Sequence, residues 1–258
     1  MLVSFSFSCT PSDEKPVLKS DELYTDTFDQ LEDFWITSEI SDPSRMKIVP
    51  DPTDSSNNTV RFFLYPDDFV NNGKRNELVL KTMDKSGYTV KYSFRFMLPP
   101  DFFKKREHDW IMIHQWHDEP PYGLDWHGYD MQTHPPINLT VKLTPGEKYY
   151  IIFNYGLWNK EINELQVAQY KKPLKPHQWY TFENTVHWNF DKTGYSQPSI
   201  DGTYLFNDEE DGKVYGANVY NEVGNYFKMG LYGNKKQRDT ISIYFDDFGY
   251  QLSSPQPD

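Results

Sequence analysis

The sequence predicts an all-β fold in which two sheets pack face to face as a sandwich. Short runs rich in β-branched and aromatic residues recur along the chain, and Gly, Pro, Asn and Asp separate them. Aromatic residues make up 17% of the 258 residues, while 18 prolines and 14 glycines punctuate the chain throughout. No repeat of fixed period and no low-complexity linker follows residue 19, so we expect one domain over residues 20–258.

Residues 1–19, MLVSFSFSCTPSDEKPVLK, differ in composition from that domain. A short apolar segment ends in small residues and Cys9, which resembles the end of a bacterial lipoprotein signal whose beginning is missing. Lipidation of Cys9 would anchor an exported protein at a bacterial surface or in the periplasm, with residues 10–19 as a flexible tether. The alternative is an N-terminus without fixed structure that carries an incidental thiol. One cysteine allows no internal disulfide.

Charge and hydropathy narrow the class of partner. The net charge of −12 argues against a general nucleic-acid binder, because such proteins cluster Lys and Arg against phosphates. No apolar run approaches the roughly 18 to 20 residues that cross a bilayer. The only membrane contact we expect is therefore a lipid at Cys9, and we expect a monomer.

The strands follow one another along the chain with few interruptions. Two short helices are predicted near the start, over residues 20–28 and 29–35, and residues 159–170 fit either a helix or an exposed hairpin. The predicted strands are 59–65, 75–80, 88–98, 110–117, 137–143, 149–155, 179–188, 226–232 and 240–250.

Three of these strands each combine an apolar face with a face of functional groups, because successive side chains of a strand point to opposite sides. The polar faces are Arg75 and Glu77; Gln115 and His117; and Tyr226, Lys228, Gly230 and Tyr232. The opposite faces are Leu78 and Leu80; Trp110, Met112, His114 and Trp116; and Phe227, Met229 and Leu231. His114 is accordingly expected in the core or on the far side of the sheet.

The polar set suits β-elimination across a glycosidic bond of a uronic-acid polysaccharide. A solvated sheet face would show mostly Thr, Ser, Glu and Lys. In this reaction a proton leaves C5 beside a carboxylate, so groups that neutralise the carboxylate stabilise the developing enediolate. Arg75 and Gln115 fit that task, and His117 and Tyr232 fit the base and the acid. A cation such as Lys228 would favour the phenolate of Tyr232. Which of the two is the base stays open.

Three ordered motifs carry a resemblance to a known family. RNEL (75–78), QWH (115–117) and YFKMGLY (226–232) resemble the signature strands R-x-E-L, Q-x-H and Y-x-K-x-G-x-Y of the β-jelly-roll polysaccharide lyases, as written for alginate lyases. QWH, PPINLTVKL, QWYTFENTVHW and KMGLY are most similar to the heparin lyase I and glucuronan lyase branch. The aromatic residue within QWH departs from the aliphatic one usual in alginate lyases, which makes alginate itself less favoured.

The resemblance implies a concanavalin A-like jelly roll whose concave sheet binds an acidic glycan. It implies endolytic cleavage of glucuronan, ulvan, a heparin-like chain or alginate, with unsaturated uronate ends and no cofactor for catalysis. Arg75 and Gln115 would contact the substrate carboxylate, His117 and Tyr232 would transfer protons, and Lys228 would assist. The further residues expected to bind substrate are Glu77, Tyr226, Trp126, His127, His134, Lys235 and Lys236.

Each of these further residues has a structural alternative. Glu77 can orient Arg75 through an ion pair, and Trp126 can pack in the core instead of stacking on a sugar. His127 and His134 can be loop histidines without a role in the reaction. The run that contains Lys235 and Lys236 can be a solvated turn rather than a polyanion-attracting patch.

A structural calcium ion is the one metal the sequence suggests. Asp246, together with an acidic N-terminal group such as Asp29, would supply hard oxygen ligands, by analogy with this fold. The histidine spacing and the single cysteine exclude the usual zinc sites.

Two other classes of function compete with a lyase. A non-catalytic glycan-binding jelly roll would use the same faces, because fold does not fix chemistry. Hydrolysis by paired carboxylates is weaker, since Glu77 has no acidic partner on its own face. Gln115 and His117 can also form a satisfied polar pair within a sandwich.

Overall fold

The fold is built almost entirely from β-strands. The structure is a computed structural model, and it describes residues 21–71, 73–102, 110–125, 129, 134–144, 148–159, 164–165, 168–207 and 210–253. Within these ranges the only helical elements are two short 3-10 turns, Pro43–Arg45 (η1) and Glu210–Gly212 (η2). None of the elements described is a helix that is long and apolar enough to cross a membrane. The prediction of an all-β fold is confirmed.

The first sheet has nine strands and forms one layer of the sandwich. Its order is β15-β14-β13-β6-β18-β4-β3, while β1 pairs with β18 and β16 with β14. The strands are β1 (Leu23–Asp26), β3 (Met46–Pro50), β4 (Asn58–Leu64), β6 (Thr89–Met97), β13 (Trp179–His187), β14 (Tyr195–Ile200), β15 (Thr203–Tyr204), β16 (Val214–Tyr215) and β18 (Ile241–Ser253).

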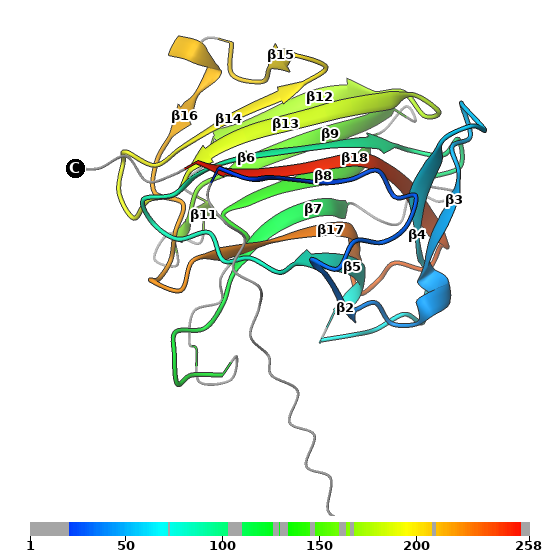
Figure 1. Cartoon of the computed structure of the whole chain (residues 1–258), viewed down its shortest axis with the longest axis horizontal. Helices are drawn as coiled ribbons and strands as arrows, with labels where there is room; N and C mark the ends of the chain where they lie inside the picture. The colour runs from blue at the N-terminus through cyan, green and yellow to red at the C-terminus, as the bar shows by residue number, and fades with distance from the viewer. Residues whose placement is uncertain are drawn as a thin grey trace, which may run out of the picture.

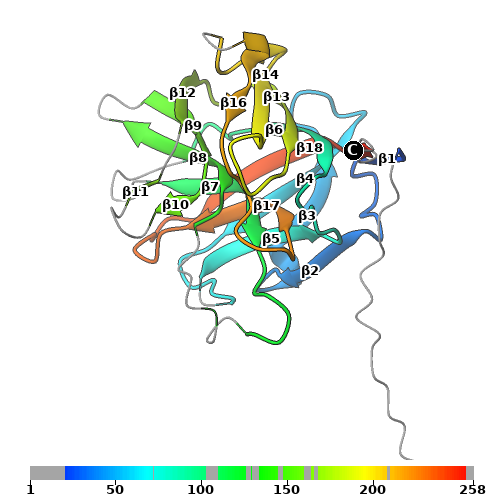
Figure 2. The same cartoon turned by 90° about the vertical axis from the view of Figure 1, so that its left-hand side faces the viewer.

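The second sheet has seven strands and forms the opposite layer, as Figures 1 and 2 show. Its order is β12-β9-β8-β7-β17-β5-β2. The strands are β2 (Trp35–Glu39), β5 (Lys74–Leu80), β7 (Ile111–Asp118), β8 (Ile137–Thr144), β9 (Lys148–Tyr155), β12 (Ala168–Leu174) and β17 (Asn225–Gly233). This order places β5, β17 and β7 side by side although they are far apart in the sequence.

Aromatic side chains fill the space between the two sheets. The ring of Phe227 lies 5.7 Å from that of Trp116 in its own sheet, and 5.7 Å from Tyr92 and 6.2 Å from Phe94 in the other sheet. Such edge-to-face and stacked contacts add to the stability that burial of the rings provides. The predicted inner faces of β5 and β17 are confirmed, because Leu78, Leu80, Phe227, Met229 and Leu231 are all buried, and so is Trp116 of β7.

Two residues of β7 point into this core with consequences for function. Trp116 is fully buried and packs against Tyr92 at 4.7 Å, so it lies on the side of the sheet away from the face predicted to bind substrate. The sequence argument that Trp116 disfavours alginate therefore loses its basis. His114 is buried as predicted, with Nδ1 2.7 Å from the carbonyl oxygen of Lys228, and burial lowers the pKa of His114 to about 3.

The two helices predicted near the start of the chain are wrong in the described part. Leu23–Asp26 forms β1 and pairs with Phe248–Gln251 of β18. The carboxylate of Asp26 accepts hydrogen bonds from the backbone amides of Phe28 and Glu32 and from the indole of Trp35, which fixes an irregular connection into β2. A side chain that caps its own following backbone in this way competes with helix formation.

The hairpin alternative for residues 159–170 is confirmed where the structure describes them. Trp158–Asn159 (β10) and Glu164–Leu165 (β11) pair antiparallel, and β12 begins at Ala168.

A buried carboxyl group gives the fold a predicted dependence on pH. Asp84 is fully buried and accepts hydrogen bonds from the hydroxyls of Tyr92, Tyr250 and Thr82. Burial raises the pKa of Asp84 to about 6, although these three hydrogen bonds act in the opposite direction. The folded protein therefore holds this proton more tightly than the unfolded chain does.

The free energy of unfolding is accordingly expected to fall as pH rises through about 6. Asp84 contributes its full share of the free energy of unfolding below about pH 4, the pKa of an aspartate in the unfolded chain. This share amounts to at most about 3 kcal/mol. Asp84→Asn should flatten part of this slope, while Asp246, whose pKa burial also raises to about 6, maintains the rest. Urea unfolding of both proteins between about pH 4 and 7 measures the slope; an unchanged slope in the variant would contradict the assignment.

Candidate active site

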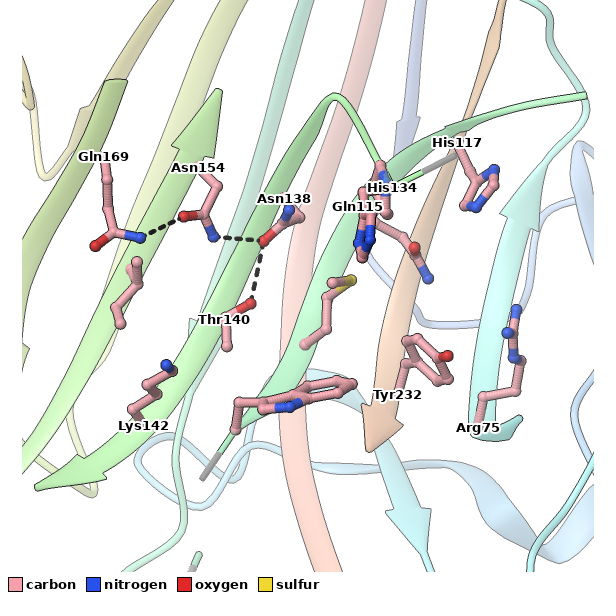
Figure 3. A pocket seen from close by; sticks show the side chains of 14 residues that line it. Arg75, Gln115, His117, His134, Asn138, Thr140, Lys142, Asn154, Gln169 and Tyr232 are labelled. Carbon is pink, nitrogen blue, oxygen red and sulfur yellow. Dashed lines mark hydrogen bonds between the residues drawn. The ribbon is translucent and has the colours of Figure 1, made fainter. Parts of the chain in front are cut away.

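A pocket of about 460 Å³ opens on the outer face of the second sheet. Figure 3 shows the side chains that line it, which come from β5, β17, β7, β8, β9 and β12 and from the segments just before β7 and β8. The lining residues are Arg75, Trp110, Met112, Gln115, His117, His134, Pro135, Asn138, Thr140, Lys142, Ile152, Asn154, Gln169 and Tyr232. Four of the five predicted catalytic residues therefore share one pocket, and Lys228 is the exception.

Cross-strand pairing brings the predicted catalytic residues together. Tyr232 of β17 lies opposite Arg75 of β5, and Tyr226 of β17 lies opposite His117 of β7. The guanidinium carbon of Arg75 lies 4.4 Å from the centre of the Tyr232 ring. Arg75 therefore lies where it can contact both the Tyr232 ring and a bound carboxylate.

Strand β7 departs from strict alternation inside the pocket. Its pairing with β8 shifts register between Met112 and His114. Trp110 and Met112 therefore line the same pocket as Gln115 and His117, whereas alternation had placed them on the opposite face. An irregularity of this kind adds a residue to one strand and reverses its faces from that point on.

Glu39 of β2 is a member of the site that the sequence did not reveal. Its carboxylate lies 2.7 and 2.8 Å from Nζ of Lys228 and 3.1 Å from Nη1 of Arg75. Burial would raise the pKa of Glu39, but Lys228 and Arg75 outweigh burial and hold that pKa below its ordinary value. A lone glutamate at the end of a short strand carries no signal in the sequence.

Glu77 positions its neighbours instead of contacting substrate. Its side chain is fully buried, so the prediction that it binds the glycan directly is wrong, and the ion-pair alternative holds. Its Oε1 accepts a hydrogen bond from Nε2 of Gln115 at 2.7 Å, and its Oε2 lies 3.7 Å from Nη1 of Arg75. Burial raises the pKa of Glu77, against the opposing charges of Lys228 and Arg75.

The structure corrects the role predicted for Lys228. The residue is only 1% exposed and does not line the pocket. Its ammonium group binds Glu39 and lies 4.9 Å from the ring centre of Tyr226, so the cation beside Tyr232 is Arg75. Tyr226 is buried as well, and burial raises its pKa well above the usual value. Lys228 and Tyr226 therefore contact the residues of the site without lining the pocket.

A row of amide side chains crosses the rest of the pocket floor. Gln169, Asn154, Asn138 and Gln115 are successive cross-strand partners on β12, β9, β8 and β7. Nε2 of Gln169 donates to Asn154 at 2.7 Å, and Nδ2 of Asn154 donates to Asn138 at 2.8 Å (Figure 3). Alternation in INLTVKL and YYIIFNY contained this signal, because Asn138 and Asn154 interrupt apolar strands. Amides both donate and accept, which suits sugar hydroxyls.

The remaining predicted binding residues divide three ways. His134 lines the pocket, where its ring loses part of its contact with water; this desolvation, together with the charge of His117, lowers the pKa of His134. Lys235 and Lys236 are exposed in the turn after β17 and do not line the pocket. Trp126, His127 and the predicted lipidation site Cys9 lie outside the described residues.

The predicted calcium ligands have other partners. Asp246 accepts a hydrogen bond from Asn57 at 2.8 Å, and Asp29 accepts one from Asn58 at 3.1 Å. Nη1 of Arg95 lies 3.7 Å from the Asp246 carboxylate. Across the described ranges no three His, Cys, Asp or Glu side chains group as a metal site would require. Calcium binding stays a prediction.

Comparison with known proteins places this geometry in context. A sequence model described as "Polysaccharide lyase" matches residues 25–249 of the chain. No curated protein matches it. Among solved structures, the endo-β-1,4-glucuronan lyase from the fungus Trichoderma reesei is similar with a TM-score of 0.59 and 14% identity, over 88% of this chain and 90% of that one.

Two further structures show how widely the architecture is shared. The alginate lyase Aly36B is similar with a TM-score of 0.56 and 11% identity, over 83% of this chain and 86% of that one. The catalytic domain of a glycoside hydrolase family 131 protein from Coprinopsis cinerea is similar with a TM-score of 0.54 and 11% identity, over 86% of this chain and 88% of that one. Since lyases and a hydrolase share the fold, the reaction has to be argued from the family match and from the side chains of the site.

Proposed function

Because the chain belongs to the polysaccharide lyase family, we propose that it cleaves a uronic-acid polysaccharide endolytically by β-elimination and leaves unsaturated uronate ends. The observation that supports this most strongly is the convergence of Arg75, Gln115, His117 and Tyr232 in one pocket. The set combines two groups suited to a carboxylate with two suited to proton transfer.

Arg75 and Gln115 neutralise and hydrogen-bond the substrate carboxylate. The proton at C5 is only weakly acidic, because the adjacent carboxylate already carries negative charge. Donors held in place before the reaction stabilise the enediolate as it forms, without reorganising at that moment. Glu39 and Glu77 hold the Arg75 guanidinium, and Glu77 holds the Gln115 amide, so both donors are fixed by buried partners.

His117 and Tyr232 transfer the protons. A base removes the C5 proton, the electron pair forms the C4–C5 double bond, the C4–O4 bond breaks, and an acid protonates O4. Each proton transfer by a positioned side chain contributes about 10²- to 10⁴-fold. Arg75 on the face of Tyr232 stabilises the phenolate that remains after Tyr232 has given its proton away.

The amide row supports a polymer that lies across the strands. From Gln115 to Gln169 the row crosses four strands, or about 14 Å at the usual strand spacing. Lys142 lines the same part of the pocket and offers a cation to a second uronate. A track that extends away from the reacting pair favours internal cleavage of a long chain. Glucuronan, ulvan, heparin-like chains and alginate all present the required carboxylate.

A panel of these four polymers tests the proposal. The ultraviolet absorbance of the new double bond reports elimination, and the size distribution of early products separates endolytic from terminal cleavage. Binding without absorbance or new reducing ends would contradict β-elimination. New reducing ends without absorbance would indicate hydrolysis.

We also propose export and lipidation at Cys9, on the sequence grounds given above. A mass shift on Cys9 in membrane fractions of an expressing bacterium, absent from Cys9→Ser, is the expected result.

We further propose a structural calcium ion bound away from the pocket. It would appear as a rise in the melting temperature of the protein that chelation reverses.

A further inference from the structure

The last two residues of β7 form a hydrogen-bonded pair at the end of the pocket. Nδ1 of His117 lies 2.9 Å from its hydrogen-bond partner, the carbonyl oxygen of Asp118. It also lies 3.1 Å from Oδ1 of Asp118, which forms no hydrogen bond with a described residue. Asp118 is fully buried, while His117 lines the pocket (Figure 3). The imidazole therefore joins a buried carboxylate to the place where the substrate would lie.

This contact fixes the tautomer of His117. Both atoms next to Nδ1 are hydrogen-bond acceptors, so the proton of the neutral ring belongs on Nδ1. Nε2 then carries the lone pair and can accept a proton. The charge of the Asp118 carboxylate, 3.1 Å from Nδ1, also stabilises the imidazolium that forms when Nε2 takes a proton. In hydrolases an aspartate orients a histidine for the same purpose, there through a direct hydrogen bond.

Asp118 is itself held by two other segments of the chain. Its Oδ2 accepts a hydrogen bond from the hydroxyl of Tyr129 at 2.9 Å, in the connection between β7 and β8. That hydroxyl accepts from Nδ2 of Asn221 at 2.9 Å, in the connection between β16 and β17. Burial raises the pKa of Tyr129 to about 12, so it stays a donor at neutral pH.

Two rings that lie near His117, those of Tyr226 and His134, do not replace the carboxylate. Tyr226 of β17 lies with its ring 6.2 Å from the imidazole, and its raised pKa keeps it neutral. His134 approaches from the connection before β8, and its pKa is lowered by burial and by the charge of His117. Neither of them offers His117 a negative charge.

We propose that Asp118 is a positioning residue that sets His117 as the base of the elimination, and that Tyr129 holds Asp118 in place. The inference rests on the proposed function. Nε2 of His117 takes the C5 proton, the C5–H electrons form the C4–C5 double bond, and the C4–O4 pair leaves on O4. Tyr232 gives O4 its proton, and solvent then returns the proton of His117 to the Tyr232 phenolate.

Two conservative variants test the proposal with effects of opposite sign. Asp118→Asn keeps the shape but removes the charge, so kcat should fall by about 10²- to 10⁴-fold. In the pH profile of kcat/KM, the rise on the acid side should move to lower pH, because the His117 imidazolium has lost the carboxylate anion that stabilises it. Tyr129→Phe removes a donor from the carboxylate and leaves more charge facing His117. For Tyr129→Phe, the rise on the acid side of the kcat/KM pH profile should move to higher pH, and kcat should stay within about tenfold of that of the original protein.

Nuclear magnetic resonance titration of the His117 ring gives a readout that does not depend on catalysis. The midpoint of this titration should move to lower pH in Asp118→Asn and to higher pH in Tyr129→Phe. Loss of packing alone would not produce shifts of opposite sign. Unchanged profiles and ring titrations in both variants, or shifts of the same sign, would overturn the proposal. If Asp118→Asn does not fold, Tyr129→Phe decides. If the original enzyme cleaves none of the polymers, the proposed function fails, whereas the ring titration still decides whether Asp118 controls His117.

Discussion

The Tyr232→Phe enzyme is expected to fold normally and to lose about 10²- to 10⁴-fold in kcat for β-elimination. The change removes only a hydroxyl group, for which no hydrogen bond to another described residue is found. The guanidinium of Arg75 stacks on the Tyr232 ring, and it can stack on a phenylalanine ring as well. Stability and KM should therefore change little, while the acid that protonates O4 is lost.

Tyr150→Phe is the matched control for this prediction. Tyr150 is half-buried on β9, at a position that alternates with Ile152 and Asn154 on the same face of the same sheet, yet it does not line the pocket. Both variants should unfold at the urea concentration of the original protein, and only Tyr232→Phe should lose activity. Full activity of Tyr232→Phe on a polymer that the original enzyme cleaves would remove Tyr232 from the proposed mechanism.

The period-2 pattern was enough to predict which faces of β5 and β17 point into the core and which point to the pocket. Phe227, Met229 and Leu231 are buried, as alternation required, and Arg75, Gln115 and Tyr232 share a pocket. Such a pattern reports which side of a sheet a residue faces, because one face must leave water. It therefore located the pocket across three distant segments once the motifs had ordered them.

The parts that the sequence could not predict depend on contacts between strands. Lys228 was expected to help Tyr232 because they share a strand, but Glu39 on β2 binds its ammonium group. The register shift in β7, which brings Trp110 and Met112 into the pocket, leaves no mark in composition or period. Partners such as these are set by strand order and register, and neither can be deduced from one strand alone.

The buried ion pair between Glu39 and Lys228 carries the second large prediction. Glu39→Ala is expected to lower the free energy of unfolding by about 3–5 kcal/mol, because it leaves a buried ammonium group without its anion. Lys228 is 1% exposed, so solvent screens its charge little. Urea unfolding at neutral pH measures the loss.

An exposed pair serves as the control for this measurement. Lys91 and Glu183 lie 2.9 Å apart with side chains 54% and 38% exposed. Glu183→Ala should cost less than about 1 kcal/mol, because solvent already screens that pair. Equal losses in Glu39→Ala and Glu183→Ala would show that the buried charge of Lys228 is stabilised by something other than Glu39.

The double variant Glu39→Gln/Lys228→Met separates the structural task of Glu39 from its task in the reaction. Removing both charges together leaves no unpaired buried ion, so much of the lost stability should return. Activity should not return with it, because Nη1 of Arg75 is held at 3.1 Å by the same carboxylate, and a neutral amide holds a guanidinium less firmly. Recovery of stability with kcat still depressed is therefore the expected result. Recovery of both would mean that Glu77 alone keeps Arg75 in place.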